Sequence, residues 1–191
     1  MATTDDRYLI WPTFAALGVP ALHIAMRATP AGPNFIYVMM VMPTLAMIWG
    51  IVGVAGFVMM GCNLAAHARK RALSWLSVCL IVGAGMLHLD TVRRYTNLAG
   101  DVLHFAVMYP FYIAEIRKLP ANGEPKLMVF NFGGMIWASG GVVYDESGEI
   151  EKPPGDQSAA WKLRAEINEL SCEGYSYTPL IRHFYIASFT C

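Results

Sequence analysis

The strongest membrane signal of this sequence is an apolar run from Phe35 to Cys62, and it constrains the fold more than any other feature. Its 28 residues, FIYVMMVMPTLAMIWGIVGVAGFVMMGC, include no Asp, Glu, Lys or Arg. An α-helix of about 20 apolar residues crosses the roughly 30 Å hydrocarbon core of a bilayer. A run of this length therefore predicts a membrane-spanning helix that is long enough to tilt.

Two further uncharged runs flank this stretch, nineteen residues at 8–26 and eighteen at 72–89. Apolar residues make up 55% of the chain and charged residues 15%, against about 45–50% and about 25% in soluble proteins. A signal peptide is the alternative for the first run, but the flank MATTDDR has one basic residue against two acids, and no small-x-small cleavage site follows. We therefore expect three transmembrane helices, over residues 8–26, 35–62 and 72–89, in a transmembrane domain of residues 1–90.

Three consecutive basic residues, Arg69, Lys70 and Arg71, separate the second and third runs. Cytoplasmic loops of membrane proteins carry an excess of Lys and Arg, so this loop is expected inside the cell. With three spans, the N-terminus is then also cytoplasmic, and residues 91–191 lie outside, in the periplasm. Arg93 and Arg94 follow the third run directly and oppose this orientation.

Residues 91–191 have the composition of an ordinary globular domain, and we expect an α+β fold with an antiparallel sheet and one helix. Residues 102–116 are too short for a fourth span and contain Pro110, which favours a core element instead. Asn122-Gly123 predicts a hairpin turn between residues 110–119 and 126–132. The other expected elements are a strand at Val142–Tyr144, a helix at 157–170, a loop at 171–180 and a final strand at 181–191.

The expected helix at 157–170 has a helical pattern of apolar residues. Asp156 or Ser158 is expected to cap its start. The apolar side is expected to hold Trp161, Leu163, Ile167 and Leu170, opposite Lys162, Glu166 and Glu169.

The cysteines fall into two pairs. Cys62 and Cys79 lie in or beside apolar runs, where cysteine behaves as a small hydrophobic residue. Cys172 and Cys191 flank the final loop and strand, and an oxidising compartment would favour a disulfide between them. Such a bridge closes a loop of about twenty residues, which is worth about 3 kcal/mol in the chain-entropy model.

The motifs of common enzymes are missing from this sequence. It has no nucleophile elbow, phosphate-binding loop or dinucleotide-binding glycine motif, and no His or Cys spacing typical of metal sites. Equal numbers of acidic and basic residues and a pI of about 6.9 argue against nucleic-acid binding. We expect no enzymatic activity, cofactor or metal; an axial haem pair formed by His23 and His88 is a minor alternative.

Three sets of residues are candidates for binding. Gly50, Gly53 and Gly56 are spaced three apart, which allows close approach of another helix, although glycine is also simply common in spans. An exposed acidic turn can steer a basic protein partner, and its members are Asp145, Glu146, Glu149 and Glu151. Lipid head groups are a second kind of partner, for which the candidates are Arg27, Arg93, Arg94 and Arg117.

The segments GGVVYDESGEI, QSAAW and HFYIASF, within about the last sixty residues, resemble a type of bacterial inner-membrane protein of unknown function. Some proteins of that type are suspected of protecting cells from toxins. The resemblance implies a non-enzymatic protein whose periplasmic domain binds another protein, such as a toxin that it neutralises. The alternative is an accessory subunit of a respiratory or transport complex, which would dock through the glycine face.

Overall fold

The computed structural model describes residues 6–31, 34, 36–120, 123–135, 138–168, 170 and 174–190. It divides into two compact units. The first, here the helical unit, comprises Met1–Met26 and Ile36–Gly100; the second, the sheet unit, comprises Arg27–Phe35 and Asp101–Cys191. Helix α4 (Leu89–Lys118) begins in the helical unit and ends in the sheet unit. The boundary thus falls within a helix, ten residues beyond the expected end of a membrane domain at residue 90.

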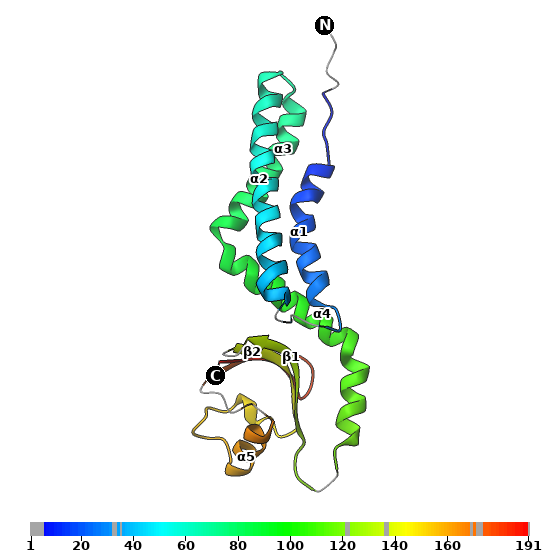
Figure 1. Cartoon of the computed structure of the whole chain (residues 1–191), viewed down its shortest axis with the longest axis vertical. Coiled ribbons are helices and arrows are strands. Elements are labelled where there is room, and N and C mark those ends of the chain that lie inside the picture. The colour runs from blue at the N-terminus through cyan, green and yellow to red at the C-terminus, as the bar shows by residue number, and fades with distance from the viewer. Residues whose placement is uncertain are drawn as a thin grey trace. The chain divides into compact units, whose positions relative to one another are not determined.

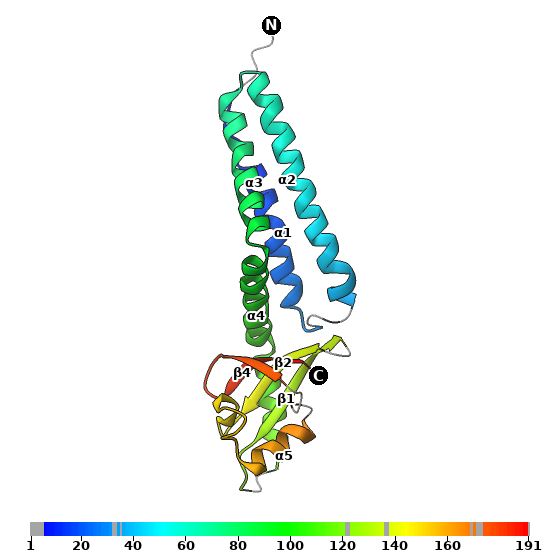
Figure 2. The ribbon, with the colours of Figure 1, turned by 90° about the vertical axis from the view of Figure 1, so that its left-hand side faces the viewer.

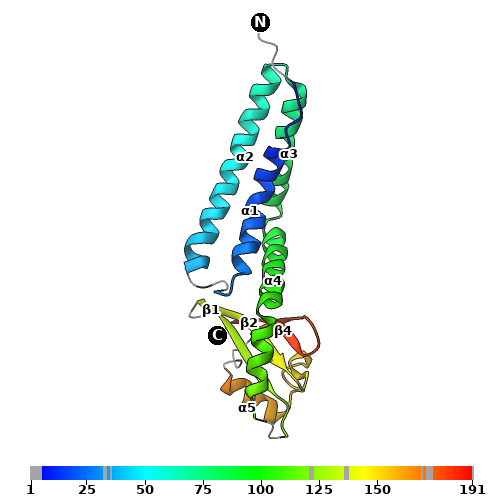
Figure 3. The same ribbon diagram turned by 90° about the vertical axis from the view of Figure 1, so that its right-hand side faces the viewer.

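The helical unit consists of helices that lie side by side (Figures 2 and 3). They are α1 (Trp11–Arg27), the π-helical turn η1 (Tyr37–Val41) that leads into α2 (Met42–Ala65), and α3 (Arg69–Leu87), followed by the start of α4. The indole Nε1 of Trp49 on α2 donates a 2.8 Å hydrogen bond to the carbonyl oxygen of Ala16 on α1. Trp11 and Trp75 meet edge to face with ring centroids 5.0 Å apart. These contacts hold α1 along both α2 and α3.

Glycine allows α2 and α3 to pack closely. A Cβ atom on Gly53 would lie 2.7 Å from Val82, and one on Gly56 would lie 2.8 Å from Val78. On α3, a Cβ atom on Gly85 would overlap the indole of Trp49. The two helices therefore pack closely over residues 49–56 of α2 and 78–85 of α3, as small residues permit between helices.

Two helices of the described chain are long and apolar enough to cross a membrane, Tyr37–Ala65 and Arg69–Leu87. The expectation of three transmembrane helices is therefore wrong. Pro residues favour the first turn of a helix, and α1 begins only at Trp11, immediately before Pro12. Its 17 residues, at about 1.5 Å each, give about 26 Å, short of the roughly 30 Å hydrocarbon core.

The sheet unit contains a four-stranded antiparallel sheet in the order β1-β2-β4-β3. The strands are β1 (Leu127–Met135), β2 (Ala138–Asp145), β3 (Gly174–Pro179) and β4 (Phe184–Thr190). The 3-10 turn η2 (Glu149–Glu151) and helix α5 (Ala159–Ile167) connect β2 to the second hairpin. The final strand thus lies inside the sheet, between β2 and β3, and the expected antiparallel sheet is present.

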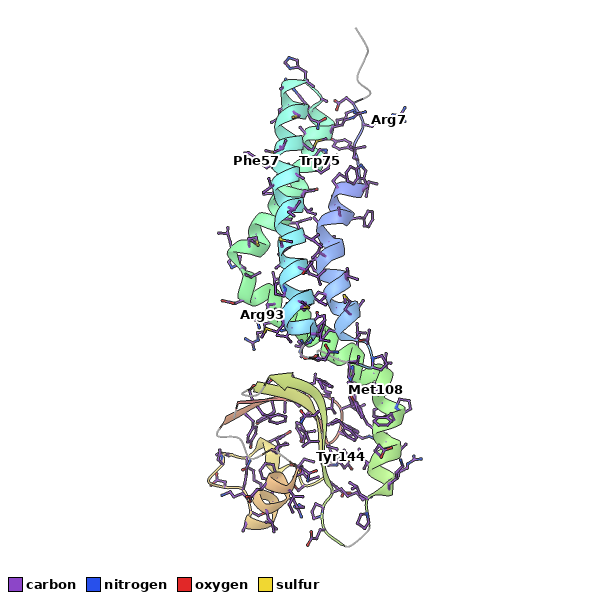
Figure 4. The ribbon with its side chains drawn as sticks, viewed as in Figure 1. Arg7, Phe57, Trp75, Arg93, Met108 and Tyr144 are labelled. Carbon is purple, nitrogen blue, oxygen red and sulfur yellow. The ribbon has the colours of Figure 1, made fainter. Side chains whose placement is uncertain are left out.

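Both faces of the sheet are covered, one by the second half of α4 and the other by α5 (Figure 1). Side chains alternate between the two faces along each strand. Val142 and Phe184 pack toward α4, whereas Val143 and Tyr185 pack toward α5. Met108 and Tyr144 point into the space between α4 and the sheet (Figure 4).

Local expectations for this half of the chain are partly correct. The strand expected at 126–132 and the final strand are present, and the Oγ of Ser158 caps α5 by accepting the N–H of Trp161 at 3.1 Å. Residues 110–118, by contrast, are helical, so they form no hairpin with β1. Residues 174–179, expected in a loop, form β3.

The expected apolar face of α5 is also wrong in part. Leu163 and Ile167 are 60% and 73% exposed, while Trp161 and Ala165 are buried. Successive residues of an α-helix are about 100° apart, so Ala165 lies about 40° from Trp161 and Leu163 about 200° from it. The residue four positions after Trp161 therefore shares its buried face, whereas the residues two and six positions after it do not.

The close packing of Gly85 on Trp49 can be tested with a matched pair of substitutions. Gly85→Ala should lower the free energy of unfolding by about 1–3 kcal/mol, because the methyl group displaces the indole in a filled space. Gly83→Ala is the control, since a Cβ there meets no atom within 4 Å. Thermal unfolding in detergent measures both, and equal melting temperatures for the two variants would contradict the packing.

Candidate functional site

The basic residues form the first turn of α3 rather than the loop before it. The chain between α2 and α3 is only Ala66–Ala68, and α3 begins at Arg69. One carboxylate oxygen of Asp6, Oδ1, accepts the backbone N–H groups of Lys70 at 2.9 Å and Arg71 at 3.3 Å. The carboxylate thus sits at a helix N-terminus, where the helix dipole favours negative charge. We call residues 66–71 the tip.

The tip has few acidic residues near it in the sequence. No Asp or Glu occurs between Asp6 and Asp90, an interval that includes the whole of α2 and α3. Arg7 and Trp75 lie toward the same end of the helical unit, and Arg93 lies toward the other (Figure 4). Among the described residues, the tip therefore combines three basic side chains with the carboxylate of Asp6.

The three glycines proposed as a docking face point in different directions. Gly53 and Gly56 pack on α3 of the same chain, whereas a Cβ atom on Gly50 would meet nothing within 4 Å. Each step of three residues turns a helix by about 300°, so Gly50 and Gly56 are about 120° apart. A spacing of three in the sequence does not keep all three residues on one face.

Gly50 opens onto a groove between α2 and α3 of about 770 Å³, which we call the central groove. Gly83 of α3 lies across from it, and a Cβ atom there also meets nothing within 4 Å. The lining holds no charged residue: Met47, Gly50, Ile51, Gly53, Val54, Ala55, Phe57, Cys79, Val82, Gly83 and Met86.

The acidic turn has a buried carboxylate at its centre. Asp145 is 1% exposed. Its Oδ1 accepts the N–H and the hydroxyl of Ser147, at 3.0 and 2.5 Å, and its Oδ2 accepts the N–H of Ile150 at 2.8 Å and the indole Nε1–H of Trp161 at 2.9 Å. Asp145 thus joins the end of β2 to η2 and α5, and it cannot present its charge to a partner.

The neighbouring carboxylates are also engaged, but they lie nearer the surface. Glu149 accepts the backbone N–H of Ser158 at 2.6 Å, and this hydrogen bond lowers the pKa of Glu149. Glu146 accepts the N–H of Lys126 at 2.8 Å. Glu146 and Glu151 are exposed, so these two remain able to face a partner.

Tyr185 lies beside this turn on β4. It is buried at 3% exposure. Burial, together with the neighbouring Glu151, raises the pKa of Tyr185 to about 12. The hydroxyl therefore stays protonated over the physiological pH range.

A second polar cluster ties residues 27–31 to α4 within the sheet unit. The guanidinium of Arg27 donates to both carboxylate oxygens of Asp101, from Nε at 2.6 Å and from Nη2 at 3.0 Å. His104 Nδ1 lies 2.8 Å from the carbonyl oxygen of Thr29, and its Nε2 lies 2.9 Å from the Tyr112 hydroxyl. A carbonyl only accepts, so Nδ1 carries the proton and, in the neutral ring, Nε2 accepts from Tyr112.

Sequence reasoning missed this cluster because its partners are far apart in the chain. Arg27 and Asp101 are 74 residues apart, and Thr29 and His104 are 75 apart. No local spacing marks either pair. Burial raises the pKa of Tyr112 to about 12, which keeps its hydroxyl protonated as a donor.

His23 and His88, the two histidines considered as haem ligands, have different surroundings. His23 Nε2 lies 2.9 Å from the amide oxygen of Asn97, and its Nδ1 lies 2.6 Å from the Tyr37 hydroxyl. Both ring nitrogens are thus occupied by hydrogen bonds, whereas an axial ligand needs one of them. His88 is exposed and is the capping residue that follows α3.

The part of the chain that the structure describes contains neither a metal site nor a disulfide. No three His, Cys, Asp or Glu side chains come together there as a metal site would require. Cys62 and Cys79 are free thiols. The predicted pair Cys172 and Cys191 lies outside the described residues.

Comparison with known proteins adds no relative: no protein-family model, curated protein or solved structure matches this chain.

The role of Asp145 can be measured by hydrogen exchange. Asp145→Ala leaves the Ile150 N–H and the Trp161 indole N–H buried without an acceptor, each at a cost of about 1–3 kcal/mol. A total of about 3 kcal/mol corresponds to roughly 100-fold faster exchange of the α5 amides. The exposed Asp156 supplies the control: Asp156→Ala should leave exchange unchanged, and equal protection in the two variants would refute the structural role.

Proposed function

We propose that this chain is a membrane protein embedded through η1–α2 and α3. In the most apolar 18 residues of Tyr37–Ala65, only 17% of the residues are buried. In the corresponding part of Arg69–Leu87, 33% are buried. A core helix of a soluble protein buries most of its apolar residues, whereas large exposed apolar surfaces mark membrane or protein contacts. The large exposed side chains of α2 are Met47, Ile48, Ile51, Val54, Phe57, Val58, Met59 and Leu64. This exposed apolar surface is the observation that carries the proposal.

The proposed orientation has the tip in the cytoplasm of a bacterium and the sheet unit in the periplasm. Basic residues at the end of a span are retained on the cytoplasmic side. Arg69, Lys70 and Arg71 stand at the start of α3, which then leads the chain across the bilayer. The side on which the sheet unit lies follows from α3 alone, so it does not depend on α1.

The proposed activity of the sheet unit is binding of another protein, without catalysis. Glu146 and Glu151 support it, because exposed carboxylates steer a basic partner. The segments that resemble bacterial inner-membrane proteins form β2 with its acidic turn, the start of α5, and β4. A toxin that acts in the periplasm or membrane is the partner that this resemblance favours.

Reporter fusions test the orientation. Alkaline phosphatase, which needs an oxidising compartment, should be active when fused after Cys191 and inactive when fused after His67, between α2 and α3. Activity of the His67 fusion with an inactive Cys191 fusion would overturn the proposed orientation.

Affinity purification from membranes tests the binding role. Glu146→Lys and Glu151→Lys should each reduce recovery of the partner severalfold at low salt, with a smaller difference at high salt because ions screen the charges. Glu166→Lys, an equal charge change at an exposed position of α5, is the control. The binding role is contradicted if no partner is recovered and if a strain lacking the protein is as sensitive to the toxin as the parent strain.

The central groove favours a second candidate function, that of an accessory subunit in a larger membrane complex. Glycines allow a neighbouring helix to approach closely. Gly50, Gly53 and Gly83 all line this groove, but only at Gly50 and Gly83 is the Cβ position open, whereas Gly53 and Gly56 already contact α3. A partner helix would therefore dock at Gly50 and Gly83.

Native gel electrophoresis of solubilised membranes separates the two functions. Gly50→Leu fills the central groove and should release the chain from the complex, so that it migrates at lower mass. Gly61→Leu changes another α2 glycine with no atom within 4 Å of its Cβ position, outside the groove lining. If both variants migrate as the unchanged chain does, the accessory-subunit function is excluded.

A further inference from the structure

A second groove lies between α2 and α3 close to the tip, and we call it the tip groove. Its volume is about 290 Å³. The lining residues are Met60 and Leu64 of α2 and Arg69, Ala72, Leu73 and Leu76 of α3. All are apolar except Arg69, which is the one of these six residues that belongs to the tip. The groove thus pairs an apolar trough with one permanent positive charge.

Arg69 has no partner for its charge among the residues that the structure describes. Its guanidinium forms no hydrogen bond or ion pair with them. The carboxylate of Asp6, which lies at the start of α3, instead accepts the backbone N–H groups of Lys70 and Arg71. Lys70 and His67 are exposed beside Arg69 and add no negative charge. The groove therefore ends in a cation that an external anion can neutralise.

We propose that the tip groove binds an anionic phospholipid. The phosphate group pairs with Arg69, whose planar guanidinium can donate two parallel hydrogen bonds to it. One acyl chain lies in the trough between Leu64 and Leu73. This inference rests on the proposed membrane insertion, because only then does the groove open into a bilayer.

The shape and the charge of the groove together select this ligand. A free phosphate would satisfy Arg69 but leave the apolar trough unfilled. A neutral acyl chain would fill the trough but leave the charge of Arg69 unpaired. Anionic lipids of the cytoplasmic leaflet attract basic residues next to spans, and the proposed orientation puts the tip in that leaflet.

Native mass spectrometry of the full chain in detergent, with phosphatidylglycerol and phosphatidylcholine of equal chain length, tests the site. The unchanged protein should retain phosphatidylglycerol in clear excess. Arg69→Gln should reduce that preference about fivefold, the contribution of one basic residue at an anionic surface. Arg69→Lys should restore much of it, because the charge returns. Lys70→Gln, which changes an exposed residue outside the groove lining, should leave it nearly unchanged.

Two further measurements test the trough and the source of the phosphate. Leu73→Trp adds bulk to the trough and should reduce retention of both lipids alike. Inorganic phosphate at millimolar concentration should not displace phosphatidylglycerol, since it gains nothing from the trough. Equal losses in Arg69→Gln and Lys70→Gln, no effect of Leu73→Trp, or displacement by inorganic phosphate would each overturn the proposal.

Failure of this proposal differs from failure of the proposed function. A chain that is extracted from membranes by alkaline carbonate is not embedded, and the lipid site falls with the membrane anchor. A chain that resists extraction but shows no preference between the two lipids is embedded without this site.

Discussion

The close packing of α2 on α3 is the contact on which the other inferences depend. Gly53 and Gly56 admit Val82 and Val78, and Trp49 occupies the space beside Gly85. Because small residues and one indole fill the space between the helices, the large apolar side chains of α2 are left on the outside. That exposed surface is what favours a bilayer around this pair, and the short connection at the tip makes both helices begin or end on the same side.

The sheet unit depends on a different kind of contact, a buried carboxylate. Asp145 is ionisable, almost fully buried and surrounded by donors from the turn, η2 and α5. Burying a carboxylate is costly unless hydrogen bonds compensate it. The full set of donors explains why this charge is tolerated inside the unit, and why the segment after β2 has one defined path rather than the freedom of a solvated turn.

The sequence predicted correctly those elements whose structure depends on residues close together in the chain. The apolar run at residues 35–62, the strand before the acidic turn and the Ser158 cap all carry their signal within a few residues. Other features are determined by distant contacts. Helix α4 continues through Pro110, although proline removes a backbone hydrogen bond, because Phe105 and Tyr112 on either side of it are buried against the sheet. Local propensity alone would have ended the helix there.

The acidic turn is a further feature that the local sequence could not predict. The letters DESGE read as a solvated charge run, and only the fold brings the Trp161 indole to Asp145. Strand β3 was missed because GYSYTP has the Gly, Ser and Pro content of a loop. An edge strand tolerates proline, since one side of its backbone needs no partner in the sheet.

The central groove and the tip groove, both between α2 and α3, differ in how they can select an occupant. Inside a bilayer, lipid tails are as apolar as leucine, so burial of an apolar surface gives little preference for one occupant over another. The central groove has only apolar and small side chains, and it can select an occupant by shape alone. The tip groove adds the charge of Arg69, which interacts strongly with an anion where water is scarce. Selection by charge is therefore expected at the tip, and selection by close packing at Gly50 and Gly83.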